Sequence, residues 1–192
     1  TDMLGVKFDH WIFSDSIILV IDTNRSPLVL GSIEFFLMTC SAILEESMAS
    51  GFPLRGAIGG GNFYKNGEIM VSSALVDAAI YEKEQDWFGA VLTPKAIKTI
   101  EQANKFIKKI GQDRGTIDLS ADKFKSFIEY GSIPWKNKSS NHNIDRRSET
   151  FYIKPYPGKY KDWTSTLPNH FDKEKAKDKI SKSHRLYSEK IT

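Results

Sequence analysis

The sequence has 192 residues, with 27 Lys and Arg against 24 Asp and Glu, one cysteine and 40% hydrophobic residues. Length and composition fit one domain with a core, or one domain with an appendage, and exclude collagen-like, disulfide-rich and wholly disordered chains. Cys40 has no partner for an internal disulfide, no apolar run approaches the ~20 residues that cross a bilayer, and no secretory leader is recognisable. We therefore expect a cytoplasmic protein without membrane contact.

Hydrophobic periodicity and turn signals predict strands that alternate with helices. Asn66-Gly67 between apolar stretches is a strong hairpin signal, while Gly51 and Pro94 mark a helix end and a helix start. We therefore expect an α/β (α+β) fold with a mixed sheet that helices cover at least in part. In the first third of the chain we predict strands at 11–13 and 17–21 around the turn 14–16, a helix at 33–48 and a strand at 54–58. A hairpin at 62–64 and 69–71 follows, then a helix at 73–84, a strand at 87–92 and helices at 94–110 and 120–131. The last part has a loop at 136–149, an edge strand at 151–153 and a charged C-terminal helix.

The net charge of +3 lies entirely in residues 170–192, which carry seven basic and four acidic side chains. This segment is rich in Lys and alternates in sign, whereas a DNA-binding face is densely basic with placed Arg. The pattern favours a solvated helix over a nucleic-acid-binding arm, so we expect no DNA partner. We divide the chain into one domain at 1–168 and a charged helix or tail at 169–192.

Few residues in the sequence could carry chemistry. Asp2, in Asp2-Met3-Leu4-Gly5, and Asp15, in the first hairpin turn, are carboxylates of the kind that hold ions near phosphates. Two such ions can stabilise the attacking and leaving oxygens of an in-line displacement, although each Asp alone is more simply a turn cap. Gly59-Gly60-Gly61 has no Lys-Ser/Thr after it, so we expect a flexible turn and not a Walker loop. No zinc-ligand spacing or nucleophile elbow is present.

The order of these pieces resembles the catalytic domain of class III nucleotidyl cyclases, the fold of adenylate and guanylate cyclases. In that family the first metal Asp lies in a phenylalanine-alanine-aspartate-isoleucine-x-glycine motif, and Asp2-Met3-Leu4-Gly5 matches its Asp-x-x-Gly core. The second lies in the next hairpin turn, where Phe13-Ser14-Asp15-Ser16 matches with Ser14 in place of the usual Gly. Residues 54–60 match a strand with glycine-x-x-x-glycine, and Val76-Asp77 matches a helix that opens near valine-asparagine. The likeness covers residues 1–95.

Within this superfamily, Phe13-Ser14-Asp15-Ser16, Leu54-Arg55-Gly56 and Ala74-Leu75-Val76-Asp77-Ala78 most resemble the bacterial anti-phage pyrimidine cyclases of Pycsar defence. The resemblance implies a largely antiparallel mixed sheet with a ferredoxin-like core. It also implies conversion of UTP, or next CTP, to the 3′,5′-cyclic monophosphate and pyrophosphate. The product would activate a separate effector, and the enzyme would be a homodimer with its active site at the interface.

The resemblance also implies roles for individual residues. Asp2 and Asp15, with Met3 as a further ligand, would hold two Mg²⁺ or Mn²⁺ ions that activate the ribose 3′-hydroxyl and neutralise the leaving pyrophosphate. Backbone N–H groups of Met3, Leu4 and Gly5 would cradle the phosphates, as turn amides do at anion sites.

Three departures from the family pattern matter. Trp11 occupies the position of the base-reading Lys of purine cyclases, and Met70 falls near that of the acidic base reader, which favours a pyrimidine. Tyr81 stands four residues after Asp77, where the family has its transition-state Arg. Candidate replacement cations are Arg55 and Lys154, with an ion pair and a solvated strand end as their simpler alternatives. Trp11, Asp77 and Lys154 are further candidates for nucleotide binding.

The third departure concerns spacing. The family has two helices, roughly 25 residues, between the first metal strand and the hairpin, whereas five residues separate Gly5 from Trp11. We expect that a segment is omitted between Gly5 and His10; the alternative is a continuous hairpin from Asp2 to Asp15. Because Tyr81 replaces Arg, a degenerate cyclase domain that dimerises or senses nucleotides is the second functional hypothesis. Nucleic-acid binding through the Lys-rich tail is the third and weakest.

Overall fold

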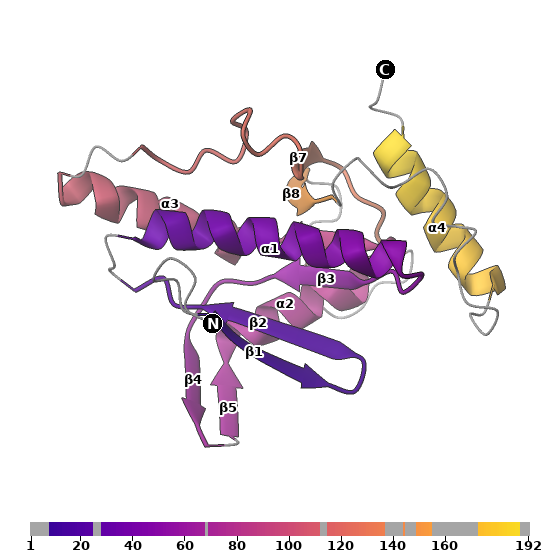
Figure 1. The fold of residues 1–192 in the computed structure, drawn as a ribbon, viewed down its shortest axis with the longest axis horizontal. Coiled ribbons are helices and arrows are strands. Elements are labelled where there is room, and N and C mark those ends of the chain that lie inside the picture. The colour runs from indigo at the N-terminus through magenta and orange to yellow at the C-terminus, as the bar shows by residue number, and fades with distance from the viewer. Residues whose placement is uncertain are drawn as a thin grey trace.

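The computed structural model describes residues 8–24, 28–67, 69–111, 115–136, 144, 149–154 and 173–188. Helices and strands are mixed along the chain (Figure 1), as the sequence predicted. In chain order the elements are β1 (Phe8–Phe13), β2 (Ser16–Ile21), α1 (Val29–Ala49), β3 (Arg55–Ile58), β4 (Phe63–Asn66), β5 (Ile69–Ser72), α2 (Ser73–Glu84), β6 (Gly89–Leu92), α3 (Pro94–Lys109), β7 (Ile128–Gly131), β8 (Thr150–Ile153) and α4 (Lys173–Ser188).

The main sheet of the described residues has the strand order β3-β6-β8-β7. β3 and β6 are parallel, while β8 runs antiparallel to both β6 and β7, so the sheet is mixed as expected. β1–β2 and β4–β5 form two separate antiparallel hairpins. Figure 1 shows both hairpins on the same side of the molecule, away from β7 and β8.

Helices cover the main sheet on both faces, as the alternation of side chains along its strands shows. Ala90, Leu92 and Ile153 pack with buried residues of α1 and α3. Val91 and Tyr152, whose side chains point the other way, pack with Trp87 and with residues of α2 and α4. The sheet is therefore the middle of three layers. No helix among the described residues is long and apolar enough to span a membrane.

Local signals place the helix ends. The Ser72 hydroxyl accepts a hydrogen bond from the Leu75 N–H at the start of α2, and Thr93 accepts one from Ala96 at the start of α3. Such N-caps satisfy backbone donors that the first helical turn leaves unpaired. α1 ends just before Gly51, whose φ of 76° is the left-handed conformation that glycine adopts without strain. These boundaries agree with the predicted ones.

The three glycines after β3 are a packing site and not the flexible turn that we expected. A Cβ on Gly59 would lie 2.2 Å from the backbone oxygen of Ala74 in α2. A Cβ on Gly60 would lie 2.3 Å from the backbone oxygen of Lys95 in α3. Only glycine therefore lets the end of β3 pass this close to the first turns of both helices.

The predicted helix at 120–131 is wrong. Residues 118–127 form successive turns in which an N–H donates to the carbonyl three residues earlier, as in Phe124 to Ala121. The Asp118 carboxylate accepts hydrogen bonds from the Ser120 N–H and hydroxyl, which favours a turn over a helix. Residues 128–131 then extend as β7 because they pair with β8.

The prediction of an edge strand at 151–153 is also wrong in its placement. β8 lies between β6 and β7, and Tyr152 and Ile153 are fully buried. A four-residue strand with no polar alternation fits an interior position, which sequence alone does not distinguish from an edge. The predicted C-terminal helix is confirmed as α4, which packs onto the sheet: the Ser183 hydroxyl accepts a hydrogen bond from the Phe88 N–H.

Candidate functional site

The first hairpin presents Asp15 at its tip. Phe13 and Ser16 pair as the last strand residues, so Ser14 and Asp15 form a two-residue turn. Ser14 has a φ of 51°, a left-handed conformation that glycine adopts more easily and that two-residue hairpin turns require. Asp15 is exposed, and its carboxylate has no ion-pair partner within the described part of the chain. It is thus an available oxygen donor for a hard cation.

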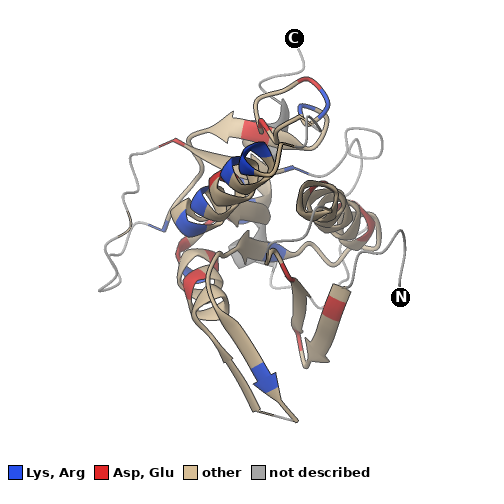
Figure 2. Ribbon diagram, turned by 90° about the vertical axis from the view of Figure 1, so that its left-hand side faces the viewer, with Lys and Arg blue, Asp and Glu red and all other residues tan. Residues whose placement is uncertain are grey.

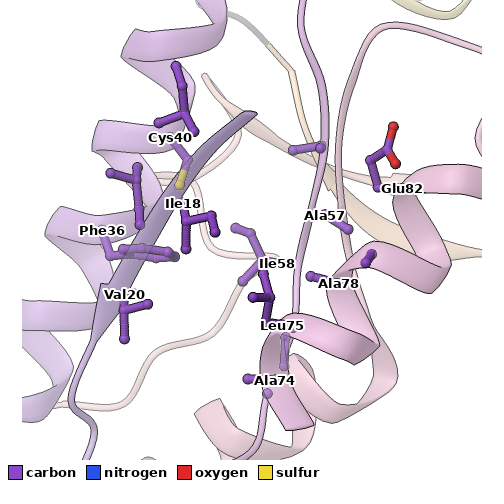
Figure 3. Close-up of a pocket in the computed structure, with 18 of the residues that line it drawn as sticks. Ile18, Val20, Phe36, Cys40, Ala57, Ile58, Ala74, Leu75, Ala78 and Glu82 are labelled. Carbon is purple, nitrogen blue, oxygen red and sulfur yellow. The ribbon is translucent and has the colours of Figure 1, made fainter. Parts of the chain in front are cut away.

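Asp15 also lines a cavity of about 690 Å³. Figure 3 shows how four elements surround this cavity: β2 with Ile18, α1 with Phe36, β3 with Ile58 and α2 with Leu75. The lining is mainly apolar. The cavity volume falls within the range of about 300–1,000 Å³ that is usual for ligand sites.

The first part of the predicted site, Asp2-Met3-Leu4-Gly5, lies outside the described residues. The sequence analysis expects an omitted segment between Gly5 and His10. Of this stretch, residues 6 and 7 lie outside the described residues, and the described chain begins with β1 at Phe8. In the described part of the chain no three His, Cys, Asp or Glu side chains gather into a metal-binding group. The binding of metal ions by Asp2, Met3 and Asp15 therefore stays a prediction. Of the three, Asp15 is described, and its carboxylate is a ligand of the type that divalent cations take.

Trp11 lies where β1 meets the second hairpin. Its ring stacks on Phe63 of β4 with 5.6 Å between the centroids, and the ammonium group of Lys65 lies 4.4 Å from its ring centroid. Lys65 is also the cross-strand partner of Met70. The two positions that the sequence analysis assigned to base reading, Trp11 and Met70, thus both adjoin the same Lys65 side chain.

Asp77 connects α2 to the start of α3. The carboxylate is buried, accepts a 2.5 Å hydrogen bond from the Thr93 hydroxyl and lies 3.4 Å from the ammonium group of Lys95. Because the burial of a carboxylate is costly without partners, these contacts explain why Asp77 is tolerated there. Its predicted role in nucleotide binding remains untested.

Tyr81, the residue that the sequence analysis compared with a transition-state Arg, packs against the core cluster around Trp87 and Tyr152. Its ring packs edge-on against Trp135 at a centroid distance of 6.2 Å. Burial and the nearby Asp77 raise the pKa of the Tyr81 phenol, so this side chain is neutral at physiological pH. Tyr81 therefore offers no positive charge to a phosphate.

Both candidate replacement cations are engaged in ion pairs. The guanidinium Nε of Arg55 lies 2.5 Å from the Glu82 carboxylate, and its Nη1 donates to the Gln85 carbonyl at 3.4 Å. The Lys154 ammonium group lies 3.3 Å from Glu129. For Arg55, an ion pair is the simpler role that the sequence analysis kept open as an alternative to catalysis. Lys154, which follows the last residue of β8, is held in an ion pair as well.

Lys179 of α4 lies near cations from two other segments of the chain, Arg55 and Lys136. Burial, Arg55 and Lys136 lower the pKa of Lys179 in α4, against the opposing effects of Asp86 and Glu82. Sequence reasoning missed this grouping, because Arg55, Lys136 and Lys179 come together only through the packing of α4. It also missed Lys65, whose proximity to Trp11 follows from contact between two separate hairpins.

Comparison of the chain with protein-family models, with curated proteins and with solved structures finds no match.

Proposed function

We propose that this protein is a nucleotidyl cyclase that converts UTP, or less readily CTP, into its 3′,5′-cyclic monophosphate and pyrophosphate. In this proposal the product is a second messenger of anti-phage defence that activates a separate effector. The observation that carries the proposal is Asp15, an exposed carboxylate in the tight turn of the first hairpin. The elements that follow include, in the order of the resemblance, a glycine-containing strand, a helix and a further strand.

In the proposed reaction the ribose 3′-oxygen attacks the α-phosphorus, the bond to the pyrophosphate oxygen breaks, and the hydroxyl proton passes to solvent. Asp15 and Asp2 would hold two Mg²⁺ or Mn²⁺ ions, whose chemistry is to acidify the hydroxyl and neutralise the leaving group. Backbone N–H groups of residues 3–5 would bind the phosphates. Asp15 supplies the negative charge that a divalent ion beside a triphosphate needs.

The surroundings of Trp11 support a pyrimidine substrate. The indole offers a flat apolar surface, and the Lys65 ammonium group beside it is a donor only, which suits the carbonyl oxygens of uracil or the single carbonyl of cytosine. Uracil has two carbonyls, which places UTP ahead of CTP.

The direct test is to incubate the purified protein with each of the four ribonucleoside triphosphates and Mn²⁺, and to identify products by mass spectrometry. We expect cyclic UMP, less cyclic CMP, and pyrophosphate in equal amount to the cyclic product. Cyclic AMP or cyclic GMP as the main product would overturn the choice of substrate. If no triphosphate yields a cyclic product, the proposed activity is wrong.

A homodimer is part of this proposal, and the hairpins supply a surface for it. Ile12, Phe13, Ile69 and Val71 expose between 54% and 70% of their surface. Figure 2 shows that the two hairpins carry few charged side chains compared with the helices. Exposed apolar side chains that cluster on neighbouring elements are typical of protein–protein interfaces.

We expect the double variant Ile69→Lys/Val71→Lys to shift the protein from dimer to monomer in sedimentation velocity experiments. Two charges in an apolar interface lose their hydration without gaining partners, which disfavours association. The control is Ile110→Lys, which changes an exposed apolar residue at the end of α3, outside the hairpins. A wild-type monomer at tens of micromolar, or a double variant that remains dimeric, would contradict this interface.

The second candidate function is a degenerate cyclase domain that senses nucleotides or dimerises without turnover. It is favoured by the ion pairs of Arg55 and Lys154 and by the neutral Tyr81, since none of the three presents an unpaired cation to a phosphate. The two candidates differ in one measurement. Saturable binding of UTP with no cyclic product at any protein concentration would favour the sensor.

A further inference from the structure

The helix α3 carries more positive charge than the chain as a whole. Its 16 residues include five lysines and one glutamate, hence a net charge of +4, whereas the whole chain has a net charge of +3. The sequence analysis considered nucleic-acid binding only for residues 170–192. In that segment Lys182 of α4 is paired with Asp86 and Asp178. A concentrated positive charge therefore lies on α3, outside the segment that the sequence analysis weighed.

Four lysines of α3 are exposed and share one face of the helix. They are Lys98, Lys105, Lys108 and Lys109, which we call the basic face. Their positions i, i+7, i+10 and i+11 lie within about 100° of one another around the helix axis and extend about 16 Å along it. The opposite side of α3 is buried in the core and consists of Ala96, Ile100, Ala103 and Ile107. Figure 1 shows the C-terminal end of α3 at the outer edge of the molecule, where the basic face is accessible.

The basic face is not neutralised by its surroundings. Other exposed lysines of the described chain are paired, as Lys123 is with Glu34 and Lys125 with Asp122. Among the described residues, no carboxylate forms an ion pair with any of the four lysines of the basic face. Glu101 is the one acidic residue of α3 and is exposed beside them. The basic face thus presents an excess of at least three positive charges to a partner.

The composition of the basic face indicates the kind of partner. Protein–protein interfaces are depleted in lysine and enriched in aromatic side chains, and the basic face has no aromatic residue. A helix that lies on a membrane buries an apolar face in the lipid, whereas the apolar face of α3 is buried in the core. Nucleic acids differ from both, because contacts to phosphates and the release of counterions supply non-specific binding by themselves.

We propose that the basic face of α3 binds the phosphate backbone of a double-stranded nucleic acid without sequence preference. Lysine is a compact point charge that suits single phosphate groups, whereas sequence is read by contacts to base edges. Proteins that bind single strands add aromatic side chains on which the bases stack, and the basic face offers none. A row of lysines on the outer side of a helix therefore fits the backbone of a duplex.

The test is the fluorescence anisotropy of a short labelled duplex, as DNA and as RNA, titrated with the protein at several salt concentrations. We expect a Kd of about 10⁻⁴–10⁻⁶ M, and a plot of log K against log salt with a slope of about −3 to −4. The double variant Lys98→Gln/Lys105→Gln is expected to bind at least about tenfold more weakly at low salt, with a slope of about −2.

The matched control is Lys123→Gln/Lys125→Gln. It removes the same amount of charge from two exposed lysines that are already paired with carboxylates. We expect this variant to keep the wild-type affinity and slope. Both double variants are expected to unfold at the wild-type temperature, because all four substitutions are at exposed positions.

Absence of binding to either duplex at low salt would overturn the proposal, as would a slope that Lys98→Gln/Lys105→Gln leaves unchanged. Equal losses in the two double variants would show that total charge, and not the basic face, is responsible. Tighter binding to a single strand or to phosphatidylserine vesicles than to the duplex would contradict the choice of partner. None of these readouts involves catalysis, so they are independent of the proposed cyclase activity.

Discussion

Asp15→Asn is expected to reduce the proposed cyclase activity by at least about 10³-fold. Asn keeps the size of the side chain and its suitability for a turn, but it removes the negative charge that would hold a divalent ion. Metal ions supply several kcal/mol of charge stabilisation in the transition state, and each 1.36 kcal/mol corresponds to a factor of about ten in rate. The measurement is the rate of cyclic UMP formation at saturating UTP and Mn²⁺.

Asp9→Asn is the matched control for this variant. Asp9 lies on β1 of the same hairpin, is exposed, and undergoes the same change of charge away from the turn. We expect it to keep wild-type activity, and we expect both variants to unfold at the wild-type temperature. Full activity in Asp15→Asn, or equal losses in both variants, would show that Asp15 holds no metal.

Gly59→Ala and Gly60→Ala are expected to destabilise the fold more than any other change of one methyl group in the described chain. The added Cβ would lie 2.2 Å from the Ala74 oxygen or 2.3 Å from the Lys95 oxygen. Both obstacles are backbone atoms of helices, so a side-chain rotation cannot relieve the overlap. Overpacking of this kind costs about 1–3 kcal/mol or more, and here α2 or α3 must move away from β3. The measurement is the free energy of unfolding from urea titration.

Gly31→Ala is the control, because Gly31 lies in α1 and a Cβ added there would meet no atom within 4 Å. Alanine in a helix is favoured over glycine by about 0.5–1 kcal/mol, so this variant is expected to match or exceed wild-type stability. If Gly59→Ala and Gly60→Ala unfold at the wild-type urea concentration, the close approach of β3 to the two helices is wrong. Failure of either to fold agrees with the expectation.

Ser14 and the Gly59–Gly61 run show how far sequence reasoning reached at the candidate site. The polar turn predicted the first hairpin correctly, since turn residues between two apolar runs act locally. The glycine run was correctly noticed but wrongly explained. Its cause is contact with Ala74 and Lys95, which follow it by many residues, and no local pattern reports such a contact.

The candidate cations illustrate the same limit. The sequence analysis proposes Arg55 as a replacement for a missing Arg, but its pairing with Glu82 depends on how α2 packs beside β3. Lys65 was overlooked because nothing in its own segment distinguishes it from a solvated lysine. Its place over Trp11 requires the two hairpins to meet.

The amino-acid sequence by itself determined the two hairpins, helices α1, α2, α3 and α4, the end of α1 near Gly51 and the start of α3 at Pro94, because these depend on residues within a few positions of each other. The tertiary structure decided that residues 128–131 form a strand, that β8 is interior, and that Arg55 and Lys136 lie near Lys179 of α4. It also decided that residues of β2, α1, β3 and α2 together line one largely apolar cavity. These features depend on contacts between distant segments, which are selected by burial of the whole core and leave no periodic signal in any one segment.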